Sequence, residues 1–146
     1  MSKQDFTHVF PLSVRWGDAD VYGHINNVEF MRYVESGRVA YCVDVMDLHL
    51  KAGMESGWVL ADMHCAYLQQ VHYPALLEIR TRISKVGNKS ATIVADIYAE
   101  GEREPVLTSK GVMVWFDMLQ QQSAPIPEQI KAQIAAFETS VEGLTA

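Results

Sequence analysis

The chain has 146 residues, of which 49% are hydrophobic and 21% charged, and its formal net charge is −6. This length predicts a single domain, 1–146, with a sizeable hydrophobic core. The acidic balance argues against a nucleic-acid-binding protein, because that role usually requires a basic excess. The sequence has no apolar stretch that could span a membrane and no secretory signal core, so we expect a cytoplasmic protein without a membrane span.

Along the chain, apolar and polar residues alternate from His8 to Trp16, which predicts a half-buried strand that starts near Pro11. The alternation assigns one inward-facing set to this strand: Phe10, Leu12, Val14 and Trp16. A helix is predicted from Asn27 to about Val45. Its apolar residues point in nearly every direction at 3.6 residues per turn, which indicates an enclosed helix.

Two local signals define this helix further. Asn26 followed three residues later by Glu29 resembles a capping box with Asn in place of Ser or Thr. Gly37 lies in the middle of the helix, where glycine costs about 1 kcal/mol relative to alanine. A close approach of the helix to a sheet would account for that glycine.

Four strand-like stretches follow, at about 58–70, 75–86, 89–99 and 105–117. The turns between them are too short for a parallel crossover, so strands that follow one another in sequence must run antiparallel. Alternation predicts the inward-facing residues of the last three strands as Leu77, Ile79, Ile83, Ala91, Ile93, Ala95, Ile97, Val112, Val114 and Phe116. A short amphipathic helix is predicted after Pro125 and Pro127, with the apolar residues Ile130, Ile134 and Phe137.

These elements predict an α+β fold, in which a curled antiparallel sheet of about five strands wraps around one central helix of about 19 residues, roughly 28 Å long. Such a small sheet leaves strand edges and part of the helix uncovered. Pairing with a second copy of the chain is the usual way to cover them.

Metal and disulfide sites are not predicted. Cys42 and Cys65 are isolated in apolar surroundings, as is typical of reduced core cysteines. The five histidines lie in different predicted elements, and no His-x-x-x-His or Cys-x-x-Cys spacing occurs. The sequence also contains no Gly-x-Ser-x-Gly, which argues against a serine hydrolase of that type.

The segment from Trp16 to Asn27 contains two carboxylates, a glycine turn and a helix start. Unpaired N–H groups at a helix start can bind an oxygen that becomes negative during a reaction. One short loop can therefore supply both a base and an oxyanion site.

This segment resembles the acyl-CoA thioesterases of the hotdog fold, in the 4-hydroxybenzoyl-CoA thioesterase-like family. Its motif is most similar to that of the bacterial long-chain acyl-CoA thioesterases. Two runs carry the resemblance, Arg15-Trp16-Gly17-Asp18-Ala19-Asp20 and Gly23-His24-Ile25-Asn26-Asn27. The resemblance implies hydrolysis of acyl-CoA in fatty acid metabolism, with coenzyme A present only as part of the substrate. It also implies a homodimer or homotetramer whose active sites lie at subunit boundaries.

The resemblance assigns the catalytic carboxylate to Asp20, as nucleophile or general base. The alternative is that Asp20 only orders the loop. The family pattern places the oxyanion donor at the backbone N–H of about Asn27. His24 either contacts Asp20 or the substrate, or is structural within the turn, and Asp18 is expected mainly to order the loop and pair with Arg15.

The substrate-binding residues are also expected from the resemblance. Related enzymes place basic residues against the CoA phosphates where this chain has Lys89 and Ser90, and Lys85 is a further candidate. Arg80 and Arg82 are weaker candidates, with the solvent side of a strand as the alternative. The expected acyl pocket contains Tyr22, Phe30, Tyr33, Val34, Val59 and Met63, although residues of these types at such spacings are also typical of a plain core.

Two other functions remain open at this stage. One is another hotdog enzyme, either an acyl-carrier-protein thioesterase or a dehydratase. The other is a non-catalytic hotdog protein that binds acyl thioesters or serves as an assembly subunit. A carboxylate at position 20 favours an enzyme, because a binding protein has no use for a base beside a thioester carbonyl.

Overall fold

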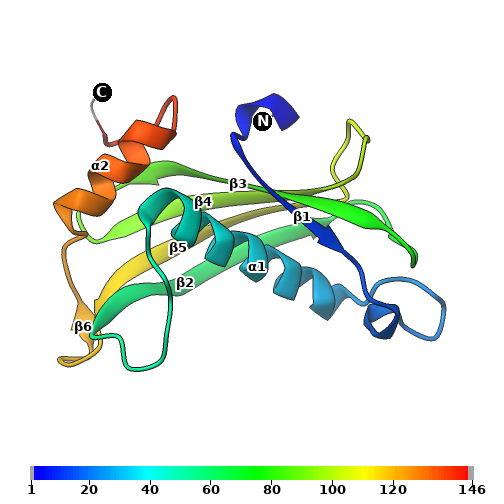
Figure 1. The fold of residues 1–146 in the computed structure, drawn as a ribbon, viewed down its shortest axis with the longest axis horizontal. Helices are drawn as coiled ribbons and strands as arrows, with labels where there is room; N and C mark the ends of the chain where they lie inside the picture. The colour runs from blue at the N-terminus through cyan, green and yellow to red at the C-terminus, as the bar shows by residue number, and fades with distance from the viewer. Residues whose placement is uncertain (1, 145–146) are drawn as a thin grey trace.

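The computed structural model describes residues 2–144, and its main elements follow the predicted order (Figure 1). The strands are β1 (His8–Ser13), β2 (Ser56–Tyr67), β3 (Leu76–Val86), β4 (Ser90–Ala99), β5 (Leu107–Asp117) and β6 (Gln122–Ser123). The helices are α1 (Asn27–Met46) and α2 (Glu128–Phe137), with the short 3-10 helices η1 (Lys3–Asp5) and η2 (Trp16–Asp18). Neither α-helix in this part of the chain is long and apolar enough to cross a membrane.

The sheet has the order β1-β3-β4-β5-β2, and every neighbouring pair is antiparallel. The short β6 pairs with the end of β5. Figure 1 shows α1 lying across one face of the curled sheet, with α2 at one end of it. The predicted hotdog fold is therefore confirmed, and β1 and β2 form its two edges.

The core between α1 and the sheet consists of two clusters of buried residues. The first cluster joins the C-terminal half of α1 to α2, where Ile130 and Ile134 are buried and Phe137 packs beside them, as predicted. The second cluster lies under the N-terminal half of α1. The prediction of an enclosed helix is only partly right, because Val28 is 61% exposed and Val39 is 38% exposed on the side of α1 that faces away from the sheet.

Gly37 marks a close approach of α1 to the sheet. A Cβ atom built on Gly37 would overlap the side chain of Ile79 and lie 3.3 Å from Oγ1 of Thr81. The prediction that Gly37 permits close helix–sheet packing is confirmed.

We expect Gly37→Ala to lower the free energy of unfolding, measured by urea denaturation. Alanine gains about 1 kcal/mol of helix propensity, but the overlap with Ile79 costs about 1–3 kcal/mol. The cost of the overlap should exceed the gain in helix propensity, because Ile79 is fully buried in a close-packed core. The neighbouring Ser36→Ala is the control and should change the value by less than about 0.5 kcal/mol. A Gly37→Ala variant more stable than the parent would contradict this packing.

The predicted inward face of β5 is wrong, and so is the inward position of Trp16 at the end of the first strand. On β5, Met113 and Trp115 are buried, whereas the predicted residues, Val112, Val114 and Phe116, lie on the opposite face. Both faces of β5 are apolar, so alternation does not distinguish them, and a one-residue error exchanges the faces. Trp16 is 79% exposed, because β1 ends at Ser13 and the chain turns into η2 before it reaches this residue.

Candidate active site

The loop between β1 and α1 is attached at both ends to the segment that leads into β3. The Val14 N–H donates to the Ala75 carbonyl at 3.0 Å, and the Ile25 N–H donates to the Val71 carbonyl at 2.7 Å. Ile25 is itself buried. These contacts hold the acidic loop in place at the N-terminus of α1.

Asp20 both orders this loop and keeps one oxygen free. Its Oδ1 accepts hydrogen bonds from the N–H groups of Tyr22, at 2.9 Å, and His24, at 3.1 Å. The Gly23 N–H donates to the Asp20 carbonyl, and Gly23 has a φ of 80°, a conformation that favours glycine. Among residues 2–144, no hydrogen bond reaches Oδ2 of Asp20. The carboxylate is therefore oriented by one oxygen and available through the other.

At the start of α1, one backbone donor has no acceptor among residues 2–144. Asn26 caps the helix, because its Oδ1 accepts from the Val28 N–H at 3.0 Å. The reciprocal half of the expected capping box is absent, since the Asn26 N–H donates to the Asp18 carbonyl and not to Glu29. The N–H groups of residues 25, 26, 28 and 29 all have acceptors, whereas that of Asn27 has none within the described chain.

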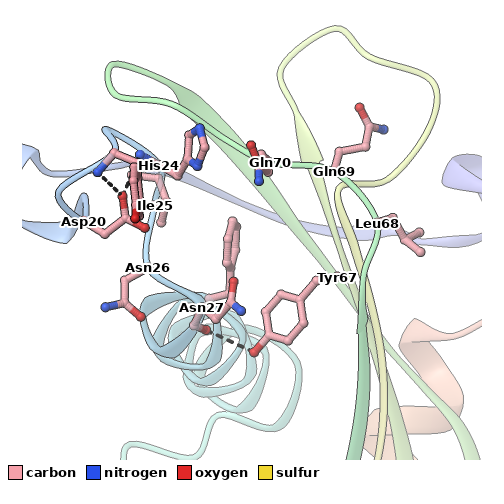
Figure 2. A pocket seen from close by; sticks show the side chains of 11 residues that line it. Asp20, His24, Ile25, Asn26, Asn27, Tyr67, Leu68, Gln69 and Gln70 are labelled. Carbon is pink, nitrogen blue, oxygen red and sulfur yellow. Dashed lines mark hydrogen bonds between the residues drawn. The ribbon is translucent and has the colours of Figure 1, made fainter.

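Asp20 and Asn27 line the same cavity, whose volume is about 560 Å³ (Figure 2). Its walls consist of Asp20, Tyr22, His24, Ile25, Asn26, Asn27, Phe30, Tyr67, Leu68, Gln69 and Gln70. The structure thus brings together five residues that the sequence proposed for the site: Asp20, Tyr22, His24, Asn27 and Phe30. It adds the segment 67–70, which no sequence motif indicated.

Comparisons with known proteins identify the family of this chain. The family model of the Thioesterase-like superfamily matches residues 14–134. The chain belongs to this superfamily. A relative from Bacillus subtilis, the uncharacterized protein YsmA, is 33% identical over 113 residues, which cover 77% of this chain and 74% of YsmA. This thioesterase-like chain therefore has thioester hydrolysis as its general reaction type.

Two further similarities concern proteins whose substrates or ligands are named. A thioesterase from Thermus thermophilus, solved in complex with coenzyme A and Zn, is 29% identical, with a TM-score of 0.81 and coverage of 92% of this chain and 96% of that one. The chloroplastic acyl-acyl carrier protein thioesterase ATL2 of Arabidopsis thaliana is 24% identical over 133 residues. These residues cover 90% of this chain and 70% of ATL2.

Asp18 of this thioesterase-like chain faces away from the Asp20 cavity. Its Oδ2 accepts a hydrogen bond from the Tyr33 hydroxyl at 2.6 Å and another from the Arg15 N–H at 3.2 Å. Burial, together with the Asp18 carboxylate, raises the pKa of Tyr33, so the hydroxyl remains a donor at neutral pH. Asp18 and Tyr33 both line a separate surface hollow of about 630 Å³.

Three other residues of the expected acyl pocket also lie outside the cavity. Val34 is 1% exposed and packs in the core. Met63 faces the same core from β2. Val59 lies opposite Val114 on the other face of β2, because a register shift between Leu60 and Asp62 changes which side chains face inward.

His24 lines the cavity and contacts a second histidine. The ring centroids of His24 and His72 are 4.4 Å apart in an edge-to-face arrangement, and the two residues form an isolated antiparallel bridge. No group of three His, Cys, Asp or Glu side chains suited to a metal ion occurs within residues 2–144. Cys42 and Cys65 are free, and burial raises the pKa of the Cys42 thiol to about 11.

The residues expected to bind CoA lie far from the cavity of the same chain. Lys85, Lys89 and Ser90 flank the turn between β3 and β4. The turn follows the Val86 end of β3, whereas the cavity lies beside the segment that leads into its Leu76 end. A strand of 11 residues is roughly 35 Å long, which separates the turn from the cavity. Arg80 instead pairs with Glu78 at 2.9 Å, and Arg82 donates to the Ser140 carbonyl.

A larger hollow of about 670 Å³ lies on the outer face of the sheet, against β2, β4 and β5 and one residue of β3, Ser84. Asp96 lines it and is 4% exposed, and burial raises the pKa of this carboxyl to about 6. This hollow contains none of the residues that the sequence proposed for catalysis.

Proposed function

We propose that this chain hydrolyses acyl-CoA thioesters to free carboxylic acids and CoA. The observation that carries the proposal is that one cavity is lined by Asp20 and Asn27, whose Oδ2 and backbone N–H, respectively, have no hydrogen-bond partner within residues 2–144. A thioester carbonyl is already electrophilic. It therefore requires little more than a placed carboxylate and a donor for the developing oxyanion.

The proposed reaction uses these two groups together. As general base, Asp20 takes a proton from water while the water oxygen bonds to the carbonyl carbon, and the carbonyl oxygen becomes an oxyanion that accepts from the Asn27 N–H. The oxyanion then collapses, the C–S bond breaks, and the CoA thiolate leaves and takes up the proton. As nucleophile, Asp20 would bond to the same carbon and release CoA, and water would then hydrolyse the resulting anhydride.

Thioesters of acyl carrier protein are the second candidate substrates, because ATL2 acts on them and matches most of this chain. Both carriers present the acyl group on the same pantetheine arm, and they differ only beyond it. Rates with acyl-CoA and with acyl carrier protein bearing the same acyl group would separate the two candidates.

A homodimer is also part of the proposal. β2 forms an edge of the sheet over 12 residues, and most of its residues are exposed, including Val59, Leu60 and Tyr67. A long exposed edge favours pairing with another strand. Two copies of β2 paired antiparallel about a two-fold axis would place the Ser56 end of one strand beside the Tyr67 end of the other. The homotetramer would then be a pair of such dimers.

This dimer would bring the expected CoA-binding turn to the cavity. Lys89 lies at the same end of the sheet as Ser56, since the Trp115 N–H donates to the Lys89 carbonyl and Ser56 pairs with Asp117. Lys89 of one subunit would therefore lie near the Asp20 cavity of the other. There it could bind the phosphates of CoA.

We expect Lys89→Glu to raise KM for acyl-CoA about five- to tenfold, because a repelling charge replaces a phosphate-binding one. KM for the pantetheine thioester of the same acyl group, which lacks those phosphates, should be unchanged. At substrate concentrations well below KM, hybrids of Asp20→Asn and Lys89→Glu subunits should exceed the mean activity of the two variant homodimers, since one site per hybrid dimer then has both native residues. Hybrids with no such gain would contradict a site shared between subunits.

The proposed activity is tested by thiol release from purified protein with acyl-CoAs from acetyl to palmitoyl and with aryl-CoAs. The proposal predicts that free thiol appears with at least one chain length. A protein that retains acyl-CoA on a desalting column and releases no thiol would instead be a binding protein.

A further inference from the structure

Tyr67 connects the end of β2 to the first turn of α1. Its hydroxyl donates a hydrogen bond to the Asn27 carbonyl at 3.1 Å, across 40 residues of sequence (Figure 2). Asn27 is the first residue of α1 and the residue whose own N–H is unpaired. A side chain from the sheet edge therefore holds the residue that we propose as the oxyanion donor.

The ring of Tyr67 contacts the core on one side, although the residue is 43% exposed. It meets Phe30 edge to face, with ring centroids 6.0 Å apart, and Phe30 is only 3% exposed. Phe30 in turn meets Tyr33 at 5.8 Å. The aromatic contacts thus anchor Tyr67 to the core, while its hydroxyl reaches the helix terminus beside the cavity.

We propose that Tyr67 is a positioning residue that holds the Asn27 backbone so that its N–H points at the thioester carbonyl oxygen. The inference rests on the proposed function, because it concerns the same oxyanion. The inference gives a role to a residue outside the segment 14–27, which contains both proposed reacting groups, the Asp20 carboxylate and the Asn27 N–H.

The helix start needs such a support. The first N–H groups of a helix lack intrahelical acceptors, so the first turn is its least constrained part. An oxyanion donor must lie about 2.7–3.1 Å from the oxygen that it stabilises. A displacement of about 1 Å can cost a factor of 10² in rate.

The hydroxyl has the protonation state that this role requires. Burial and the neighbouring Cys65 raise the pKa of Tyr67 above its ordinary value, so the phenol retains its proton at neutral pH. A protonated phenol donates to a carbonyl, as the contact with Asn27 requires.

The first test is the steady-state kinetics of Tyr67→Phe, which keeps the ring and its contact with Phe30. We expect kcat to fall about five- to tenfold, the factor for one hydrogen bond, and KM to stay within about twofold. Tyr73→Phe is the matched control, because Tyr73 is exposed, lies outside the cavity and makes no side-chain hydrogen bond within residues 2–144. It should leave both constants unchanged.

An unchanged kcat in Tyr67→Phe would overturn the proposal. A raised KM with unchanged kcat would also overturn it, since Tyr67 would then bind substrate and not position the donor.

The second test is independent of activity. The 15N order parameter of the Asn27 amide, measured by NMR relaxation, should be lower in Tyr67→Phe than in the parent and the same in Tyr73→Phe. If the parent releases no thiol from any thioester, the proposed function fails, and this order parameter alone decides whether Tyr67 holds the Asn27 backbone. An unchanged order parameter would then overturn the proposal.

Discussion

Asp20→Asn is expected to lower kcat for acyl-CoA hydrolysis by at least about 100-fold, the lower range for loss of a general base. The substitution is nearly isosteric. The amide oxygen can occupy the Oδ1 position and still accept from the N–H groups of Tyr22 and His24. The amide nitrogen then replaces the free Oδ2 and can act neither as base nor as nucleophile. The loop should keep its shape while the chemistry is lost.

Asp18→Asn is the matched control, because Asp18 is two residues away and faces a different hollow. It weakens the hydrogen bond from the Tyr33 hydroxyl, so we expect a lower thermal midpoint and a kcat within about threefold of the parent. If Asp18→Asn abolished activity and Asp20→Asn did not, the working carboxylate would be Asp18.

Asn27→Pro should lower kcat by about 10²- to 10³-fold, the cost of removing one oxyanion donor. Proline has no N–H and is favoured at the first position of a helix. The backbone already suits it, because Asn26 has φ −63° and ψ 137°, the extended conformation that a residue before proline prefers. The variant therefore deletes the unpaired donor and leaves the helix start intact, which circular dichroism and the thermal midpoint would check.

Asn27→Ala is the control for this variant, since it removes the side chain and keeps the N–H. We expect its kcat to stay within about threefold of the parent, because the proposed donor is the backbone. If Asn27→Ala lost as much activity as Asn27→Pro, the side-chain amide would be the functional group instead.

Those parts of the fold that depend on local signals were predicted from the sequence. Asn26 caps α1 as expected, because a cap depends only on residues within one turn. The antiparallel directions of β2 to β5 followed from the short turns between them. Their order did not follow, because β2 pairs with β5 at the edge of the sheet and not with β3, its neighbour in sequence. The inward face of β5 could not be predicted from the sequence pattern, because both of its faces are apolar and only the packing against α1 distinguishes them.

The same distinction applies to the site. Asp20, His24 and Asn27 lie within one short loop, so a single motif indicated all three. The segment 67–70 reaches the cavity only through the sheet topology, which places the end of β2 beside the start of α1. Met63 and Val59 were assigned to one pocket, but the register shift in β2 separates them onto opposite faces. No local pattern reveals such a shift.

The convergence of Asp20 and Asn27 on one substrate is tested most directly by a crystal structure of Asp20→Asn with unhydrolysed acyl-CoA. We predict that the thioester carbonyl oxygen lies about 2.7–3.1 Å from the Asn27 nitrogen, with the residue 20 side chain facing the carbonyl carbon or a water beside it. A thioester bound elsewhere, such as in the outer hollow lined by Asp96, or in the cavity with its carbonyl turned away from Asn27, would contradict the account.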